Sequence, residues 1–154
     1  SQPVRRFDAM EDPTVAAWVN GLQPPGTVGL YVKYNVGVAG LIAVADIAFP
    51  ELMEVDGLVF IKARYAGFSQ KTLDDWRERL GDDGAALARV VNNFVVWDEL
   101  DVDGDGDDIS DVMAAEFIAE CWRARAAADF PDRNIVVEVV DQYGPTVVMY
   151  EPNV

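Results

Sequence analysis

Hydrophobic residues recur every three to four positions over several stretches of the chain, which is the spacing of helices with one buried face. Capping residues mark their boundaries: Asp12 precedes the first helix, Ser69 and Ser110 precede two others, and Gly81 follows the third. For 37–48 a strand is the alternative, because Val, Ile and Gly lower helix propensity. The predicted helices span roughly 13–20, 37–48, 70–80, 84–97 and 111–128.

Elsewhere hydrophobic and polar residues alternate, which predicts half-buried strands. Asp56-Gly57 is a typical hairpin turn, and a second hairpin closes the chain. The predicted strands span 27–34, 52–55, 58–65, 135–140 and 146–150. We therefore predict a single α+β domain, 1–154, with a mainly antiparallel sheet of about four strands packed by helices and a C-terminal β-hairpin. Residues 1–7 are predicted to be a loose tail.

Composition narrows the classes of function. The chain of 154 residues carries a net charge of −15, which argues against direct nucleic-acid binding, since phosphates attract Lys and Arg. Its longest apolar run, 36–45, is too short to span a bilayer. The lone Cys121 forms no internal disulfide and no signal peptide is visible, so we expect a cytoplasmic location. The oligomeric state is left open.

One short segment holds about half of this charge. Between Asp98 and Asp111 there are seven Asp and one Glu with no Lys or Arg, which is −8 of the net −15. Such a loop, 98–110, either stays solvated or is compacted by positive charge. Adaptation to high salt is a rival explanation for an acidic chain, but it predicts evenly spread acids. The candidate partner-binding residues are Asp98, Glu99, Asp101, Asp103, Asp105, Asp107 and Asp108.

The same segment resembles half of a calcium loop. Asp101, Asp103 and Asp105 occupy its first, third and fifth positions, with Gly106 at the sixth. The second half departs from the pattern, because Val112 stands where a bidentate Glu closes such sites and Asp111 falls one residue short. Asp101, Asp103, Asp105 and Asp111 are therefore candidate ligands for Ca²⁺ or Mg²⁺, and no other cofactor is indicated.

Groups for catalysis are scarce. The absence of histidine removes Ser-His-Asp and Cys-His arrangements and the commonest general base. Glu116 and Glu120, one helical turn apart, leave carboxylate catalysis open, although an enzyme is not favoured. Asn92, Asn93 and Trp97 form a polar cluster at a predicted helix end, where either function or simple helix capping explains them.

Several short motifs resemble a family of small, uncharacterised bacterial proteins. The resemblance covers roughly residues 36–150. Members of that family carry Asn-His-x-His where this chain has Asn92-Asn93-Phe94-Val95, so any chemistry of those histidines is lost here. The family has no assigned activity, so the resemblance implies no function. Its motifs here are Phe49-Pro50, Glu54-Val55-Asp56-Gly57, Trp76, Leu80-Gly81-Asp82, Val91-Asn92-Asn93, Asp98, Trp122, Phe130-Pro131-Asp132-Arg133 and Tyr143-Gly144-Pro145-Thr146-Val147.

These observations favour a non-enzymatic acidic protein-binding module of the inhibitor, immunity or accessory type, which engages a basic protein partner through the loop. The first alternative is binding of Ca²⁺ or Mg²⁺ by the same loop. The second is a small ligand-binding protein or enzyme with a pocket between sheet and helices. We expect no membrane partner.

Overall fold

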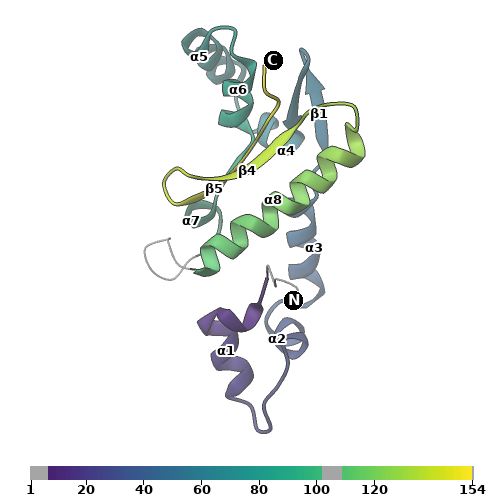
Figure 1. Ribbon diagram of the computed structural model, residues 1–154, viewed down its shortest axis with the longest axis vertical. Helices are drawn as coiled ribbons and strands as arrows, with labels where there is room; N and C mark the ends of the chain where they lie inside the picture. Colours follow the sequence, from purple (N-terminus) through teal and green to yellow (C-terminus); the bar gives the residue numbers. More distant parts are fainter. Residues whose placement is uncertain (1–6, 102–108, 154) are drawn as a thin grey trace, which may run out of the picture.

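The computed structural model describes residues 7–101 and 109–153, which form helices and two small antiparallel sheets (Figure 1). The fold class is therefore α+β, as predicted. The helices are η1 (Ala9–Glu11), α1 (Pro13–Asn20), α2 (Val28–Asn35), α3 (Gly37–Ala48), α4 (Lys62–Ala66), α5 (Gln70–Leu80), α6 (Gly84–Val91), α7 (Val96–Glu99) and α8 (Ile109–Asp129). The strands are β1 (Leu52–Val55), β2 (Leu58–Ile61), β3 (Asn93–Val95), β4 (Val136–Asp141) and β5 (Pro145–Tyr150).

The strands form two sheets, so the prediction of one sheet of about four strands is wrong. β1 pairs with β2, and the other sheet has the order β3-β5-β4. The side chain of Asn92 occupies the place beside β2 where a further strand would pair. Its amide accepts a hydrogen bond from the Ile61 amide (2.8 Å) and donates one to the Val59 carbonyl (3.0 Å). The backbone groups of this edge are thereby satisfied without another strand.

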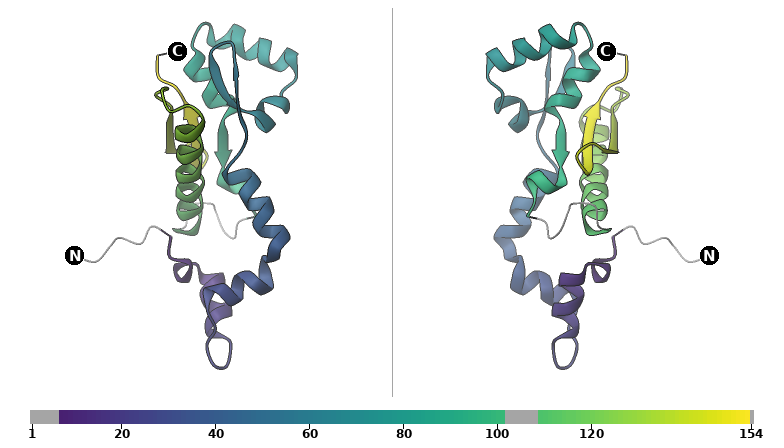
Figure 2. Two further views of the ribbon diagram at one scale, coloured as in Figure 1. Left: turned by 90° about the vertical axis from the view of Figure 1, so that its right-hand side faces the viewer. Right: turned by 90° about the vertical axis from the view of Figure 1, so that its left-hand side faces the viewer.

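The principal core lies between α8 and the three-stranded sheet, which run side by side in both views (Figures 1 and 2). Trp122 of α8 is 1% exposed and meets the ring of Phe94 edge to face, with ring centroids 6.4 Å apart. Cys121 is buried on the same helix. The closing hairpin of β4 and β5, also predicted, presents Val147 and Met149 to this core.

A smaller core lies under the β1–β2 hairpin, where α5 and α6 bury Phe60, Leu73, Leu87 and Val91. The turn at Asp56-Gly57 has positive φ at both residues, as the predicted tight hairpin requires. The predicted strand 58–65 is wrong beyond residue 61, where α4 begins. β1 has only four residues, so the longer strand has no partner to pair with.

The predicted strand over 27–34 is wrong, because this segment is helix α2. The Thr27 hydroxyl caps it by accepting a hydrogen bond from the Leu30 amide (3.1 Å). No described strand lies alongside to pair with it, and a helix satisfies its own backbone groups. Trp18 of α1 contacts the rings of Tyr31 and Tyr34, which the helical turn brings to one side.

The predicted helix over 84–97 ends early, at Val91. Residues 93–95 pair with β5 instead, and residues 96–99 form the short helix α7. The spacing of hydrophobic residues over 92–97 fits either a helix or a strand. Residues 93–95 form a strand because β5, which is distant in sequence, provides the backbone hydrogen-bond partners. The prediction that Ser110 precedes the last helix is also wrong, because α8 already includes Ile109 and Ser110.

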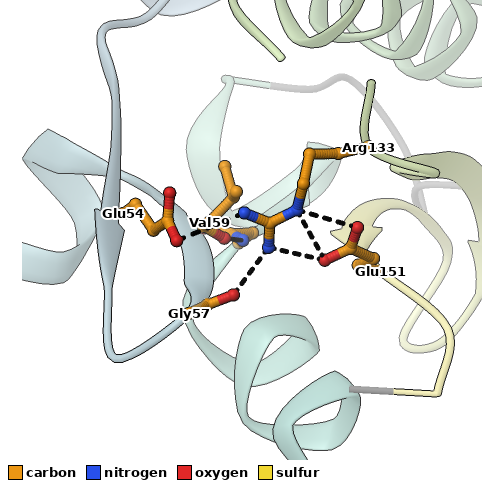
Figure 3. A network of polar contacts seen from close by, with 6 residues as sticks. Glu54, Gly57, Val59, Arg133 and Glu151 are labelled. Atoms are coloured by element: carbon orange, nitrogen blue, oxygen red, sulfur yellow. Dashed lines mark hydrogen bonds and ion pairs between the residues drawn. The ribbon is translucent and has the colours of Figure 1, made fainter. Parts of the chain in front are cut away.

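An ion-pair network ties the C-terminal end of the chain to the β1–β2 hairpin (Figure 3). Arg133 donates to both carboxylate oxygens of Glu151 (2.6–3.1 Å) and to the Gly57 carbonyl (2.6 Å), and it lies 3.3 Å from Glu54. The guanidinium holds the pKa of Glu151 below its ordinary value, and Glu151 raises that of Arg133. Three segments distant in sequence are thus fixed together.

The last turn of α3 contributes Ala48 to the principal core, while the rest of α3 leads away from it to α2, and α1 and α2 make one end of an elongated molecule (Figures 1 and 2). We call α2 and α3 the apolar arm. No single helix in the described residues is long and apolar enough to cross a membrane, whereas α2 and α3 together reach that length and composition but are bent by 96°.

Candidate functional site

A cavity of about 460 Å³ lies where the first turn of α8 meets the start of α1 and the end of α7. Three carboxylates line it, those of Asp12, Asp101 and Asp111, together with the Ser110 hydroxyl and Tyr31. No Lys or Arg is among its lining residues. We call this cavity the acidic cavity, and its size is within the range of small-ligand sites.

Asp12 connects the two helices that form the cavity. As predicted, it caps α1, accepting a hydrogen bond from the Val15 amide (3.0 Å). Its other carboxylate oxygen accepts a hydrogen bond of 2.6 Å from the Ser110 hydroxyl. This bond holds the pKa of Asp12 below its ordinary value, so the carboxylate is charged at neutral pH. The contact joins residues 98 positions apart.

Asp111 and Asp101 complete the negative lining. Asp111 is buried, with 5% of its surface exposed, and belongs to the first turn of α8. The positive end of the helix dipole there favours a negative side chain. Asp101 is exposed beyond the end of α7. Because the cavity is bounded by both segments that flank 102–108, it lies at the base of the predicted acidic loop.

The structure describes three of the seven predicted partner-binding residues. Asp98 and Asp101 are exposed, whereas Glu99 forms an ion pair with Arg64 of α4 at 2.9 Å. Arg64 also lies over the rings of Phe94 and Trp122, so Glu99 is held against the protein's own cation. The remaining predicted residues lie outside the described part of the chain: Asp103, Asp105, Asp107 and Asp108.

The predicted metal ligands are only partly described. Asp101 and Asp111 line the same cavity, whereas Asp103 and Asp105 lie outside the described residues. Within residues 7–101 and 109–153, no group of three or more His, Cys, Asp or Glu is placed to hold a metal ion. The metal prediction therefore depends on residues 102–108.

The polar cluster of Asn92, Asn93 and Trp97 is divided among different roles. Asn92 is fully buried and, besides its bonds to β2, donates to the Met149 carbonyl of β5 (3.2 Å). Asn93 donates to the Val90 carbonyl at the end of α6 (3.0 Å). Trp97 is half exposed and its indole N–H donates to the Tyr143 carbonyl. The bonds of all three are to backbone groups, and none of these side chains lines the acidic cavity.

The groups considered for catalysis do not meet in this cavity. Glu116 and Glu120 are exposed on α8 and are not among its lining residues. Burial raises the pKa of the Cys121 thiol, which keeps the sulfur protonated and unreactive at neutral pH. The arrangement offers negative charge and hydrogen-bond acceptors for a cation.

Sequence reasoning identified the carboxylates of 98–111 as one cluster but missed Asp12, Ser110 and Tyr31 as neighbours of it. Asp12 has a complete local explanation as a helix cap, so nothing in the sequence indicates a second contact. Predicting the contact between Asp12 and Ser110 would require knowing how the start of α1 lies against the first turn of α8. That packing depends on tertiary contacts such as the edge-to-face pair of Phe7 and Phe117.

In comparisons with protein families, with curated proteins and with solved structures, the chain has no significant match. The resemblance drawn from its motifs stays a prediction, and function has to be argued from the site itself.

Proposed function

We propose that this chain is a non-enzymatic binding module that engages a basic protein partner through its acidic end. The acidic end comprises the acidic cavity and the adjoining segment 98–111. The observation that carries the proposal is a cavity lined by the three carboxylates of Asp12, Asp101 and Asp111, with no Lys or Arg among the described residues that line it. It adjoins a segment that holds −8 of the net charge of −15.

Electrostatics explains why such an end suits a basic partner. Carboxylates crowded into one region repel each other, and a Lys or Arg side chain entering the cavity relieves that repulsion. A concentrated patch of one sign also steers a partner of opposite sign during diffusional encounter, which raises the association rate at low salt. Exposed Trp97 and Leu100 beside the cavity supply apolar contact area that purely electrostatic binding lacks.

The cavity also suits the shape of a single basic side chain. An Arg guanidinium presents several donors in one plane, and carboxylate oxygens are its preferred acceptors. Asp12 and Asp111 come from two different helices that converge on the cavity, so they approach an inserted group from different sides. We therefore propose that an Arg-containing segment of the partner enters there.

The test uses a ten-residue polyarginine peptide as probe, with binding measured by calorimetry at several salt concentrations. Asp101, Asp103, Asp105 and Asp107 are changed together to Asn. We expect affinity for the peptide to fall by roughly 100-fold or more. The reason is that four carboxylates at the protein surface lose their electrostatic attraction to the arginines of the peptide at the same time. The wild-type affinity should also fall steeply with added salt.

A matched control removes the same charge at the other end of the molecule. Asp74, Asp75 and Asp82 are changed to Asn and Glu78 to Gln, all in or next to α5 (Figure 1). If both quadruple variants weaken binding equally, overall charge rather than the acidic end binds the peptide. Unchanged, salt-insensitive affinity in the first variant contradicts the proposal directly.

Binding of a divalent cation is the second candidate function. The observation that favours it is that Asp101 and Asp111, two of the four predicted ligands, line one cavity. Carboxylate oxygens are the ligands that Ca²⁺ accepts in flexible geometry. Calorimetric titration with Ca²⁺ tests it, with the Asp101→Asn variant as comparison. Absence of heat and of any shift in Tm at millimolar Ca²⁺ excludes this function.

A further inference from the structure

The apolar arm exposes hydrophobic side chains along its whole length. Between residues 28 and 49, eleven large apolar residues are 36–81% exposed, with Val38 the most exposed and only Ala48 buried in α3. α8, by contrast, buries a row of apolar residues against the sheet, among them Ile118 and Trp122. The eleven are Val28, Leu30, Val32, Tyr34, Val36, Val38, Leu41, Ile42, Val44, Ile47 and Phe49.

The exposed area exceeds what a solitary chain ordinarily leaves in water. Side chains of this size, about half exposed, leave roughly 100 Å² each, so together they expose on the order of 1,000 Å². The largest apolar patch on a typical monomer is only about 300–600 Å². A stable protein interface takes about 800 Å² from each partner. The arm therefore has enough apolar surface for a complete interface.

On α3 this surface forms one continuous stripe. Positions three, four and seven residues apart lie on the same side of a helix, and the exposed residues of α3 follow that spacing. The opposite side, through Val44, Ile47 and Ala48, is turned to α8, where it borders a cavity of about 190 Å³ with Phe94 and Phe117. The members of the stripe are Val38, Leu41, Ile42 and Ala45, whereas Phe49, just beyond the helix, lies under the guanidinium of Arg125 of α8.

Among the described residues, none packs over the outer side of the stripe. The residues that the structure does not describe are 1–6, 102–108 and 154, whose only large apolar residues are Val4, Val102 and Val154. Residues 1–6 are otherwise polar and basic, and residues 102–108 are acidic. The stripe is therefore open to a second molecule.

Charge indicates which molecule it is. From Val28 to Phe49 the only charged residues are Lys33 and Asp46, so this region is neutral and the whole net charge of −15 lies elsewhere. Two such acidic chains repel each other over most of their surface, and the arm is where they can meet without that repulsion. We propose that the apolar arm is the interface of a homodimer, in which α3 packs antiparallel against α3 of a second copy.

The ends of α3 support this pairing. The helix begins after Val36 without a side-chain cap and has no acidic residue in its first turn, so its own side chains offer no negative charge to its N-terminal amides and positive dipole end. Exposed Asp46 lies near the other end of the same helix. In an antiparallel pair related by a twofold axis, Asp46 of each copy lies beside the N-terminal part of the other copy's α3. The negative charge of Asp46 in each copy thus meets the positive end of the α3 dipole in the other copy. A twofold interface requires this kind of self-complementarity.

A bilayer fits the arm less well than a second copy. α3 is about 18 Å long and α2 is shorter, against a hydrocarbon core of about 30 Å, and the two are bent by 96°. The one lysine of the arm is not a basic cluster, and the net charge of −15 repels anionic lipid surfaces. Neutral vesicles are therefore the appropriate comparison in the test.

The oligomeric state of the full chain is measured by sedimentation equilibrium over a range of concentrations. We expect a mass of twice 16.9 kDa for the wild type. In the Leu41→Glu and Ile42→Glu double variant we expect the dissociation constant to rise by roughly 30-fold or more, the effect of losing interface hot spots. Both side chains are exposed in the single chain, so circular dichroism should show the variant folded.

The control is the Ile109→Glu and Val112→Glu double variant, which places the same two charges at exposed apolar residues outside the arm and should leave the dimer intact. A monomeric wild type at high micromolar concentration overturns the proposal, as does a dimer that the double variant leaves unchanged. A monomeric wild type that cosediments with phosphatidylcholine vesicles, when the double variant does not, assigns the arm to lipid instead. Binding of polyarginine is measured separately, so failure here leaves the proposed function of the acidic end unaffected.

Discussion

Helices α3 and α8 show that hydrophobic content alone does not decide burial. α3 has one charged residue, Asp46, in twelve, and yet only Ala48 of it is buried. α8 carries charged residues along its length and buries seven residues, among them Trp122. The difference lies in what stands opposite each helix: a three-stranded sheet faces α8, whereas none of the described residues packs over the outer stripe of α3. Burial requires a complementary surface as well as an apolar side chain.

The largest expected contrast comes from removing the central side chain of the α8 core. Trp122→Ala should lower the free energy of unfolding by about 4 kcal/mol, because a fully buried aromatic leaves a cavity that its neighbours cannot fill. Chemical denaturation measures the change. Trp97→Ala serves as the control, since Trp97 is half exposed and should cost less than about 1.5 kcal/mol. Equal losses would contradict the assignment of the core to α8.

The next effect concerns the amide that joins the two sheets. Asn92→Ala should destabilise the protein by about 3 kcal/mol, because backbone groups of Val59, Ile61 and Met149 lose their buried hydrogen-bond partner. Asn93→Ala removes a single bond to Val90 and should cost about 1 kcal/mol. Thermal unfolding of both variants measures the difference, and a larger loss in Asn93→Ala would contradict it.

A smaller, pH-dependent effect is expected at the ion pair of Arg133 and Glu151. The folded-state pKa of Glu151 lies below its ordinary 4.5, so the pair contributes its full stability above that pH and loses it as pH falls through the lowered value. Glu151→Gln should cost about 1 kcal/mol at pH 7, and the cost should vanish in strong acid. Denaturation at several pH values measures it.

The control for this pair is Glu51→Gln. Glu51 pairs with Lys62 in an exposed position, where solvent screens the interaction, so little change at any pH is expected. A cost at Glu151 that persists unchanged at low pH would show that packing rather than charge stabilises this contact.

The smallest effect should come from the arm. Val38→Ser changes a residue that is 81% exposed and should alter the free energy of unfolding by less than about 0.5 kcal/mol at concentrations where the chain is monomeric. The identical change at Val147, which is fully buried in β5, should cost about 3 kcal/mol. A large effect at Val38 in dilute solution would show that the arm packs within its own chain.

Local signals predicted much of the secondary structure. The first helix, α5 and the turn between β1 and β2 were predicted with nearly correct bounds, because the caps Asp12 and Ser69 and the Asp56-Gly57 turn act within a few residues. The bounds of α3 and of the closing hairpin were also nearly correct. The alternation over 27–34 predicted a strand, whereas the segment is α2. That failure is physical, since a strand needs a neighbour and the sequence of one segment does not contain it.

The sequence predicted the negative charge of the candidate site but not the cavity in which part of it lies. The cluster of acids from Asp98 to Asp111 is visible in the sequence, and its metal and partner predictions concern residues that lie largely in 102–108. The acidic cavity also depends on Asp12, which reaches Ser110 only because α1 folds back on α8.

The sequence by itself determined where α1 and α5 begin at their caps, which residues prefer burial, and where negative charge concentrates. These properties depend on interactions within a few positions of each other, or on composition. Only the tertiary structure decided that Asn92 divides the strands into two sheets, that Asp12 joins the acidic cavity, and that the apolar stripe of α3 stays exposed. Each of these depends on which distant segments become neighbours, because a hydrogen bond or a buried surface requires a partner that local sequence does not specify.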